Sequence, residues 1–278
     1  IAALSMGSSE YAFSMVVAVY VCMLAWGAWR LSGRGVALLS PWANQVFLFC
    51  TALALYLSIS FWPYAAYILR TLITSVGPAF YFYYAVMFVV LALVLAIPVG
   101  AMGGTMPLLF ANVRRTVGDI GSVVGRLYTW NTVGCVCGAL VGGYWLLVFF
   151  DLDGIYKLCL ITMALSGLLL FPWRTSPRTQ QRLVSCALGA ACLTPLMLEG
   201  WNKTYLGNGL FRTTYPMAGA YDGPTEFYAG LRGDVEQVAY KDSPNSTVSI
   251  SEYAAPAAVK ELNNGGEKNR YIQKNEKT

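Results

Sequence analysis

Histidine and charge are what this sequence has least of. No histidine occurs among the 278 residues, and only 12% of them are charged, whereas 56% are hydrophobic. Histidine is the commonest transition-metal ligand in proteins and the commonest general base. Its absence argues against a redox subunit with its own metal centre, and we expect the chain to bind no cofactor.

Cysteine is missing from the last part of the chain. All seven cysteines lie before residue 199 and fall in apolar runs, so a disulfide framework is not expected. Cys135 and Cys137 are the only close pair, and residues two apart on a helix point in different directions. We interpret them as small packing residues.

The hydrophobic residues form runs too long for ordinary buried helices. A membrane-spanning helix needs about 20 apolar residues, and windows of that length predict six helices. Their ranges are Ser9–Leu31, Asn44–Leu69, Pro78–Phe110, Gly121–Phe150, Ile155–Phe171 and a weak Leu183–Leu198. The chain begins at Ile1 rather than methionine, and we expect the native N-terminus to lie upstream. The sequence thus predicts an α-helical polytopic membrane protein with five or six transmembrane helices over 1–198 and a small soluble tail over 199–278.

The third helix is too long to be straight. Residues that weaken helices lie in its second half, namely Pro98, Gly100, Gly103, Gly104 and Pro107. Proline removes a backbone hydrogen bond, and glycine lets the freed carbonyls find other partners. We therefore expect a break, kink or hinge there.

Small residues recur every four positions in the fourth helix. Gly134, Gly138 and Gly142 lie on one helical face, where a neighbouring helix could approach closely. Tyr128 and Asn131 lie near Gly134 on this face and favour a polar contact between helices. The spacing predicts a packing surface for another helix, within this chain or in another membrane subunit.

The arginines predict the orientation of the helices. Alternate loops are basic and contain Arg30, Arg34, Arg114, Arg115, Arg174, Arg178 and Arg182. By the positive-inside rule these loops are cytoplasmic. If the sixth helix crosses the membrane, as we expect, the tail lies outside the cytoplasm, periplasmic in a bacterial inner membrane. A re-entrant sixth helix would return it to the cytoplasm.

The tail contains strand and turn signals. Two alternating runs, Asp234–Lys241 and Thr247–Ser251, flank turn residues and predict a β-hairpin, and Asn263–Gly266 predicts a further turn. Large apolar side chains are few, so the tail has a thin core and should rest on another part. Upstream, we interpret Asp151 and Asp153 as residues of a solvated turn that caps the fifth helix.

The stretch from Gly100 to Gly143 carries a family resemblance. Its segments GAMGGTMPLL and GRLYTWNTVGCVCGALVGG, joined by a short basic loop, resemble the membrane half of the membrane-bound spermidine synthase-like family. The segments GSSEYAF and VYVCMLAWG near the N-terminus and QVAYKDSPNSTVSI in the tail are also similar to that family. The resemblance implies a bundle like half of a major facilitator, followed by an aminopropyltransferase domain that acts on polyamines.

The sequence contains no counterpart of the catalytic part of that family. A Gly-rich strand-to-helix turn for the S-adenosyl cofactor is not found, so no catalytic, cofactor-binding or metal-binding residue is predicted. The first hypothesis is therefore a non-catalytic membrane subunit or scaffold in contact with lipid and other membrane proteins, with no nucleic-acid partner. The alternatives are the membrane anchor of a spermidine synthase and a small transporter, which would lack a membrane-buried acid for proton coupling.

Overall fold

The structure is a computed structural model of residues 1–278. It describes the ranges 10–32, 40–73, 79–113, 120–207, 210, 219–232, 235–243, 247–253, 259–264 and 267–273. The predicted cytoplasmic residues Arg34, Arg114 and Arg115 lie outside these ranges.

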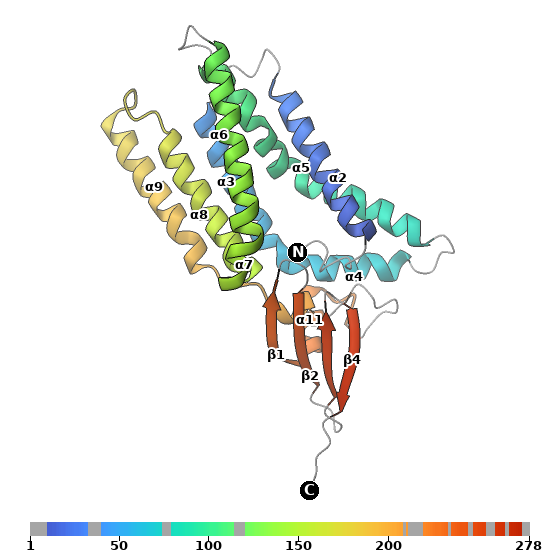
Figure 1. The fold of residues 1–278 in the computed structure, drawn as a ribbon. Helices are drawn as coiled ribbons and strands as arrows, with labels where there is room; N and C mark the ends of the chain where they lie inside the picture. Colours follow the sequence, from blue (N-terminus) through green and yellow to red (C-terminus); the bar gives the residue numbers. More distant parts are fainter. Residues whose placement is uncertain are drawn as a thin grey trace. The chain divides into compact units, whose positions relative to one another are not determined.

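Long helices make up most of the described chain (Figure 1). They are α2 (Glu10–Arg30), α3 (Pro41–Ser58), α4 (Trp62–Ile73), α5 (Ala79–Val113), α6 (Ile120–Leu140), α8 (Leu152–Leu170) and α9 (Arg178–Met197). In the described residues, five helical segments are long and apolar enough to cross a membrane, and α9 is not among them. The prediction of a helical protein with several membrane-length helices is confirmed.

Local sequence explains where several helices begin and change. Ser40 precedes α3 and accepts a hydrogen bond from the backbone N–H of Ala43 (3.1 Å), while Pro41 takes the first helical position, where no N–H is needed. The predicted second helix is divided by a 3₁₀ turn, Ile59–Phe61, just before Pro63. The predicted fourth helix ends in a π-helical turn, Val141–Trp145, followed by α7 (Leu146–Phe149).

The expected break does not interrupt the third helix in the structure. The single 35-residue helix α5 contains both Pro98 and Pro107. Each proline costs one backbone hydrogen bond, which an otherwise apolar helix of this length tolerates when its neighbours pack against it. The proposal of a hinge at these residues remains a prediction.

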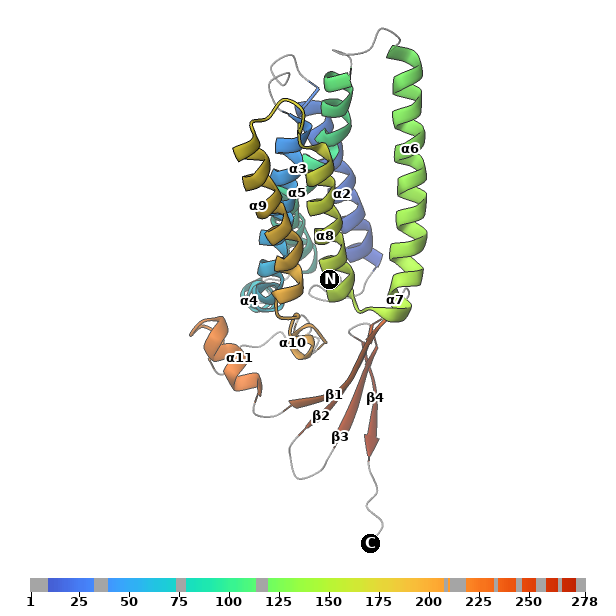
Figure 2. The same cartoon turned by 90° about the vertical axis from the view of Figure 1, so that its left-hand side faces the viewer.

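The chain divides into two compact units, of which one comprises Ala18–Tyr56 and Leu91–Gly200. In this unit, α3 is tied to two neighbours by buried amides. Asn44 Nδ2 donates to the carbonyl of Ala101 in α5 (3.1 Å), and Gln45 Nε2 donates to Ser166 Oγ in α8 (2.6 Å). α8 and α9 lie side by side, whereas most of α6 stands apart from the other helices (Figure 2).

The other unit comprises Ile1–Val17, Leu57–Val90 and Trp201–Thr278, so the tail folds together with α4. It contains α10 (Lys203–Gly207), α11 (Pro224–Arg232) and a four-stranded sheet. Tyr67 of α4 stacks on Phe227 of α11 with 4.8 Å between ring centroids, and both are buried with Leu210 and Ala220. α4 thus supplies the support that the thin tail requires.

The sheet is an antiparallel meander in the order β1-β2-β3-β4. Its strands are Val235–Asp242, Thr247–Tyr253, Val259–Asn264 and Glu267–Gln273. β1 and β2 form the predicted hairpin, which Thr247 Oγ1 secures by donating to the Asp242 carboxylate (2.7 Å). β3 and β4 pair antiparallel on either side of the predicted second turn, with Asn264 opposite Glu267, while Gly265 and Gly266 of that turn lie outside the described residues.

Candidate functional site

The glycine face of α6 is uncovered by the described chain. A Cβ atom added to Gly134, Gly138 or Gly142 would meet no other atom within 4 Å. Every residue from Asn131 to Leu140 is exposed, and the large side chains of Trp130 and Leu140 are 69% and 60% exposed. This packing surface therefore stays a prediction, and within this chain no described element fills it.

Asn131 lies on this face without a hydrogen-bond partner among the described residues. An amide in hydrocarbon loses its bonds to water, and a neighbouring helix is the usual source of replacements. Tyr128 makes one contact, since its ring lies 5.2 Å from that of Phe110 in α5. The predicted polar contact between helices is thus available from α6 but not completed within the described chain.

Close helix packing occurs instead between α2 and α5. A Cβ atom on Gly27 would overlap the carbonyl oxygen of Gly100, and one on Gly103 would overlap the carbonyl oxygen of Leu24. Gly104 faces the side chain of Leu31 in the same way. Two glycines predicted as hinge residues, Gly100 and Gly103, therefore lie at a backbone-to-backbone contact, and Gly104 packs against a side chain. Gly27, a lone glycine between tryptophans, was not predicted to take part in this contact.

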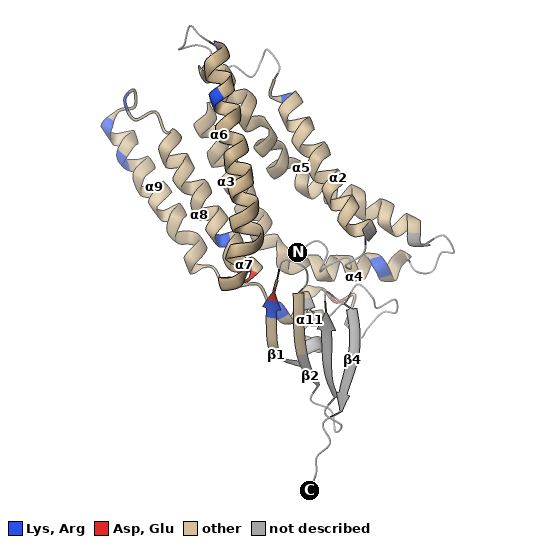
Figure 3. Ribbon diagram, in the orientation of Figure 1, with Lys and Arg blue, Asp and Glu red and all other residues tan. Residues whose placement is uncertain are grey.

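The described basic residues of the predicted cytoplasmic loops gather at one end of the unit that contains α6, α8 and α9. Arg30 ends α2, Arg178 begins α9 with Arg182 one turn later, and Arg174 lies in the link between α8 and α9. Figure 3 shows Lys and Arg positions near these helix ends and almost none along the helix middles. This distribution suits helices whose middles lie in hydrocarbon.

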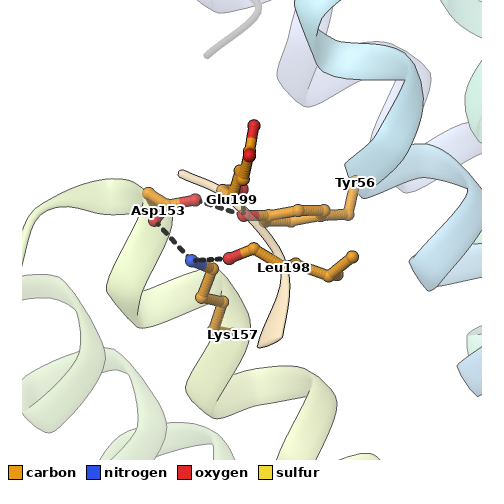
Figure 4. Close-up of polar contacts among 5 residues, drawn as sticks. All are labelled: Tyr56, Asp153, Lys157, Leu198 and Glu199. Atoms are coloured by element: carbon orange, nitrogen blue, oxygen red, sulfur yellow. Dashed lines mark hydrogen bonds and ion pairs between the residues drawn. The ribbon is translucent and has the colours of Figure 1, made fainter. Parts of the chain in front are cut away.

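A polar cluster lies where α3 and α9 end and α8 begins (Figure 4). The Tyr56 hydroxyl lies 2.5 Å from Asp153 Oδ1 and 3.0 Å from the carbonyl oxygen of Glu199. Lys157 Nζ lies 3.2 Å from Asp153 Oδ2 and donates to the carbonyl of Leu198 (2.9 Å). The cluster joins three helices through one carboxylate, one ammonium and one phenol.

The environment of these groups is only partly aqueous. Tyr56 is 2% exposed, and the side chains of Asp153 and Lys157 are 17% and 18% exposed. The helix dipoles stabilise both charges: the negative charge of Asp153 lies at the N-terminal end of α8, and the positive charge of Lys157 lies at the C-terminal end of α9. The opposite charges are paired and bonded to neighbouring groups. The arrangement is therefore better suited to holding the three helices together than to binding or converting a substrate.

The expectation of a solvated cap by Asp151 and Asp153 is wrong in its detail. Asp151 stands at the N-cap position of α8, but its side chain makes no cap hydrogen bond. Asp153 instead takes part in the tertiary cluster, because folding brings Tyr56 to it from 97 residues away. Only the spacing of Asp153 and Lys157, four residues apart on one helix, could have indicated the ion pair.

A second aromatic contact fixes the tail to α4. Tyr64 and Tyr228 donate hydroxyl hydrogen bonds to the carbonyls of Ala220 (3.0 Å) and Ser60 (2.8 Å), and Tyr205 stacks on Tyr228 at 4.0 Å. Burial, above all, raises the pKa of Tyr228 to about 12, because the phenolate would lose water contacts. At neutral pH this phenol is therefore a proton donor.

The described residues hold no group of three or more His, Cys, Asp or Glu side chains that could hold a metal ion. The seven cysteines are free thiols in the described helices. A scan of protein-family models and searches of curated proteins and of solved structures found no significant match to this chain.

Proposed function

We propose that this chain is a non-catalytic membrane scaffold subunit that binds other membrane-embedded subunits through α6. The observation that carries the proposal is the exposure of this helix over its apolar length. Only 6% of an 18-residue apolar window within Gly121–Phe149 is buried. Lipid could cover the apolar side chains, but it supplies neither close packing for Gly138 nor a partner for Asn131. A neighbouring helix supplies both.

The proposed arrangement in the membrane places the arginine-bearing ends in the cytoplasm and the tail outside it, in a bacterial inner membrane. Two sets of contacts support it. The Tyr56 hydroxyl bonds to the carbonyl of Glu199, so α3 and α9 end at the same side of their unit. α9 begins with Arg178 at the arginine-bearing end and extends to this opposite side. The tail then packs on α4, which follows α3 in the chain.

One substitution on α6 tests the scaffold function. Gly138→Leu adds a bulky side chain on the proposed contact face, and overpacking of this kind costs about 1–3 kcal/mol. The variant should lose its co-purifying membrane proteins and migrate faster on a native gel in mild detergent. Because no described atom lies within 4 Å of an added Cβ at Gly138, the fold of the chain itself should be preserved.

Two control variants make the result specific. Gly125→Leu is the same substitution on another face of α6, where an added Cβ also meets nothing within 4 Å, and Ala139→Leu lies at nearly the same depth as Gly138. Both should assemble like the parent. Normal assembly of Gly138→Leu, or equal loss in the controls, would contradict binding through this face.

The membrane anchor of an aminopropyltransferase is the second candidate. It is favoured by the antiparallel sheet, because strands β1 and β2 form from the segment similar to the strand pair that opens the synthase part. This function requires a cytoplasmic tail, where the S-adenosyl cofactor is found. Saturable binding of an S-adenosyl ligand to the purified chain, measured by calorimetry, would favour the anchor over the scaffold.

A further inference from the structure

The junction between α9 and the tail is held by side chains from two other helices. α9 ends at Met197, and the chain continues in an extended conformation at Leu198 (ψ 136°). The last carbonyls of a helix have no partner within it. The carbonyls of Leu198 and Glu199, directly after the helix, accept hydrogen bonds from Lys157 of α8 and Tyr56 of α3.

Asp153 connects the two donors to each other. Its Oδ1 lies 2.5 Å from the Tyr56 hydroxyl and its Oδ2 lies 3.2 Å from Lys157 Nζ (Figure 4). A tyrosine hydroxyl has a single hydrogen, which Asp153 and the Glu199 carbonyl must share. The next residue, Gly200, passes so close that an added Cβ would lie 3.2 Å from Asp153 Oδ2.

These bonds depend on one another because the charged groups are largely out of water. Removal of one partner leaves Asp153 or Lys157 partly buried with its charge uncompensated, which is costly. Any displacement of residues 198–200 would break the bonds to Lys157 and Tyr56 together. The two accepting carbonyls belong to adjacent residues, and both donors contact Asp153, so a displacement of this segment acts on both bonds.

We propose that Tyr56, Asp153 and Lys157 form a latch that fixes where the chain leaves α9 and that opens as one cooperative unit. The closed latch ties the end of α9 to α3 and α8. The open latch releases the first residues of the tail together with the last turn of α9. This conformational device is independent of any partner bound at α6.

Hydrogen exchange measured by mass spectrometry on the full chain in lipid nanodiscs tests the latch. Tyr56→Phe removes the hydroxyl and keeps the ring, and Lys157→Met removes the ammonium and keeps most of the stem. Each should raise the exchange rate of amides in residues 198–202 by about tenfold, the usual effect of losing a hydrogen bond to a charged group. The double variant should exchange no more than slightly faster than the faster single variant.

Tyr156→Phe is the matched control, because it removes another tyrosine hydroxyl bond between α8 and α3, from Tyr156 to the Ala52 carbonyl (2.9 Å). It should leave exchange at residues 198–202 unchanged. If Lys157→Met fails to fold, Asp153→Asn takes its place in the same comparison. Unchanged exchange in the single variants, or a double-variant effect equal to the product of the two single effects, overturns the latch.

Discussion

Gly27 and Gly100 bring the backbones of α2 and α5 into contact, because a Cβ atom on Gly27 would overlap the carbonyl oxygen of Gly100. The contact between Gly103 and the Leu24 carbonyl continues it one turn further along both helices. In lipid, association of helices depends on such close packing rather than on exclusion of water. The pair is therefore a main determinant of how these two helices associate.

Gly27→Ala should destabilise the protein. The added methyl group forces the two backbones apart, which we expect to cost about 1–3 kcal/mol and to lower the melting temperature in detergent. Gly189→Ala in α9 is the control, since an added Cβ there meets nothing within 4 Å and alanine favours helix over glycine. A Gly27→Ala protein as stable as the control would show that the contact relaxes at no cost.

Gln45 and Ser166 should be energetically coupled. Their 2.6 Å hydrogen bond joins α3 to α8 at a buried position. A double-mutant cycle with Gln45→Leu and Ser166→Ala, followed by denaturation in detergent, should give a coupling free energy of about 0.5–1.5 kcal/mol, the range for such bonds between membrane helices. Purely additive effects would mean that the bond contributes nothing.

Cysteines introduced at Ser176 and Ser243 should differ in their reaction with an impermeant thiol reagent. Ser176 lies in the arginine-bearing link between α8 and α9, and Ser243 follows β1 in the tail. In intact cells the reagent should label the second and not the first, with the parent chain measured as background for its seven native cysteines. Equal shielding of both sites would place the tail in the cytoplasm and favour the synthase anchor.

The docking of α11 on α4 should weaken at high pH. An unfolded tyrosine titrates near pH 10, whereas the pKa of Tyr228 is raised to about 12 in the folded protein. The folded state therefore holds this proton more tightly, so the contribution of Tyr228 to stability is complete below pH 10 and is lost as the pH rises toward 12.

The difference in tyrosinate absorbance between the parent and Tyr228→Phe measures this titration. Its midpoint should lie well above 10, and the stability difference between the two proteins should shrink over the same pH range. A midpoint near 10 would mean that Tyr228 is not held at Ser60 as the structure places it.

The sequence predicted the helices and strands better than it predicted the contacts between them. Runs of apolar residues predicted α2, α5 and α8 to within a few residues, because a long helix needs only local hydrogen bonds and a hydrophobic surface. They predicted α6, the π-helical turn and α7 as one helix. The 3₁₀ turn before Pro63 was not predicted, since proline is tolerated in the first turn of a new helix as well as in loops.

The candidate site was predicted only in part. The regular spacing of Gly134, Gly138 and Gly142 predicts a packing face on α6 and the π-helical turn after it, which stays a prediction, whereas the contact of Gly27 with Gly100 had no periodic signal. Likewise, Asp153 was interpreted as a local cap, although its main partner, Tyr56, lies 97 residues away. Local patterns cannot select among distant partners.

The sequence by itself determined that this protein is built of long apolar helices with basic ends and a tail containing a β-hairpin, because these features follow from local periodicity and composition. The tertiary structure alone decided which glycines meet, which helix carries the tail and which groups hold the end of α9. Each of these depends on residues that are distant in the chain and come together only when the helices pack, where short-range contacts between backbone, aromatic and charged groups select one arrangement.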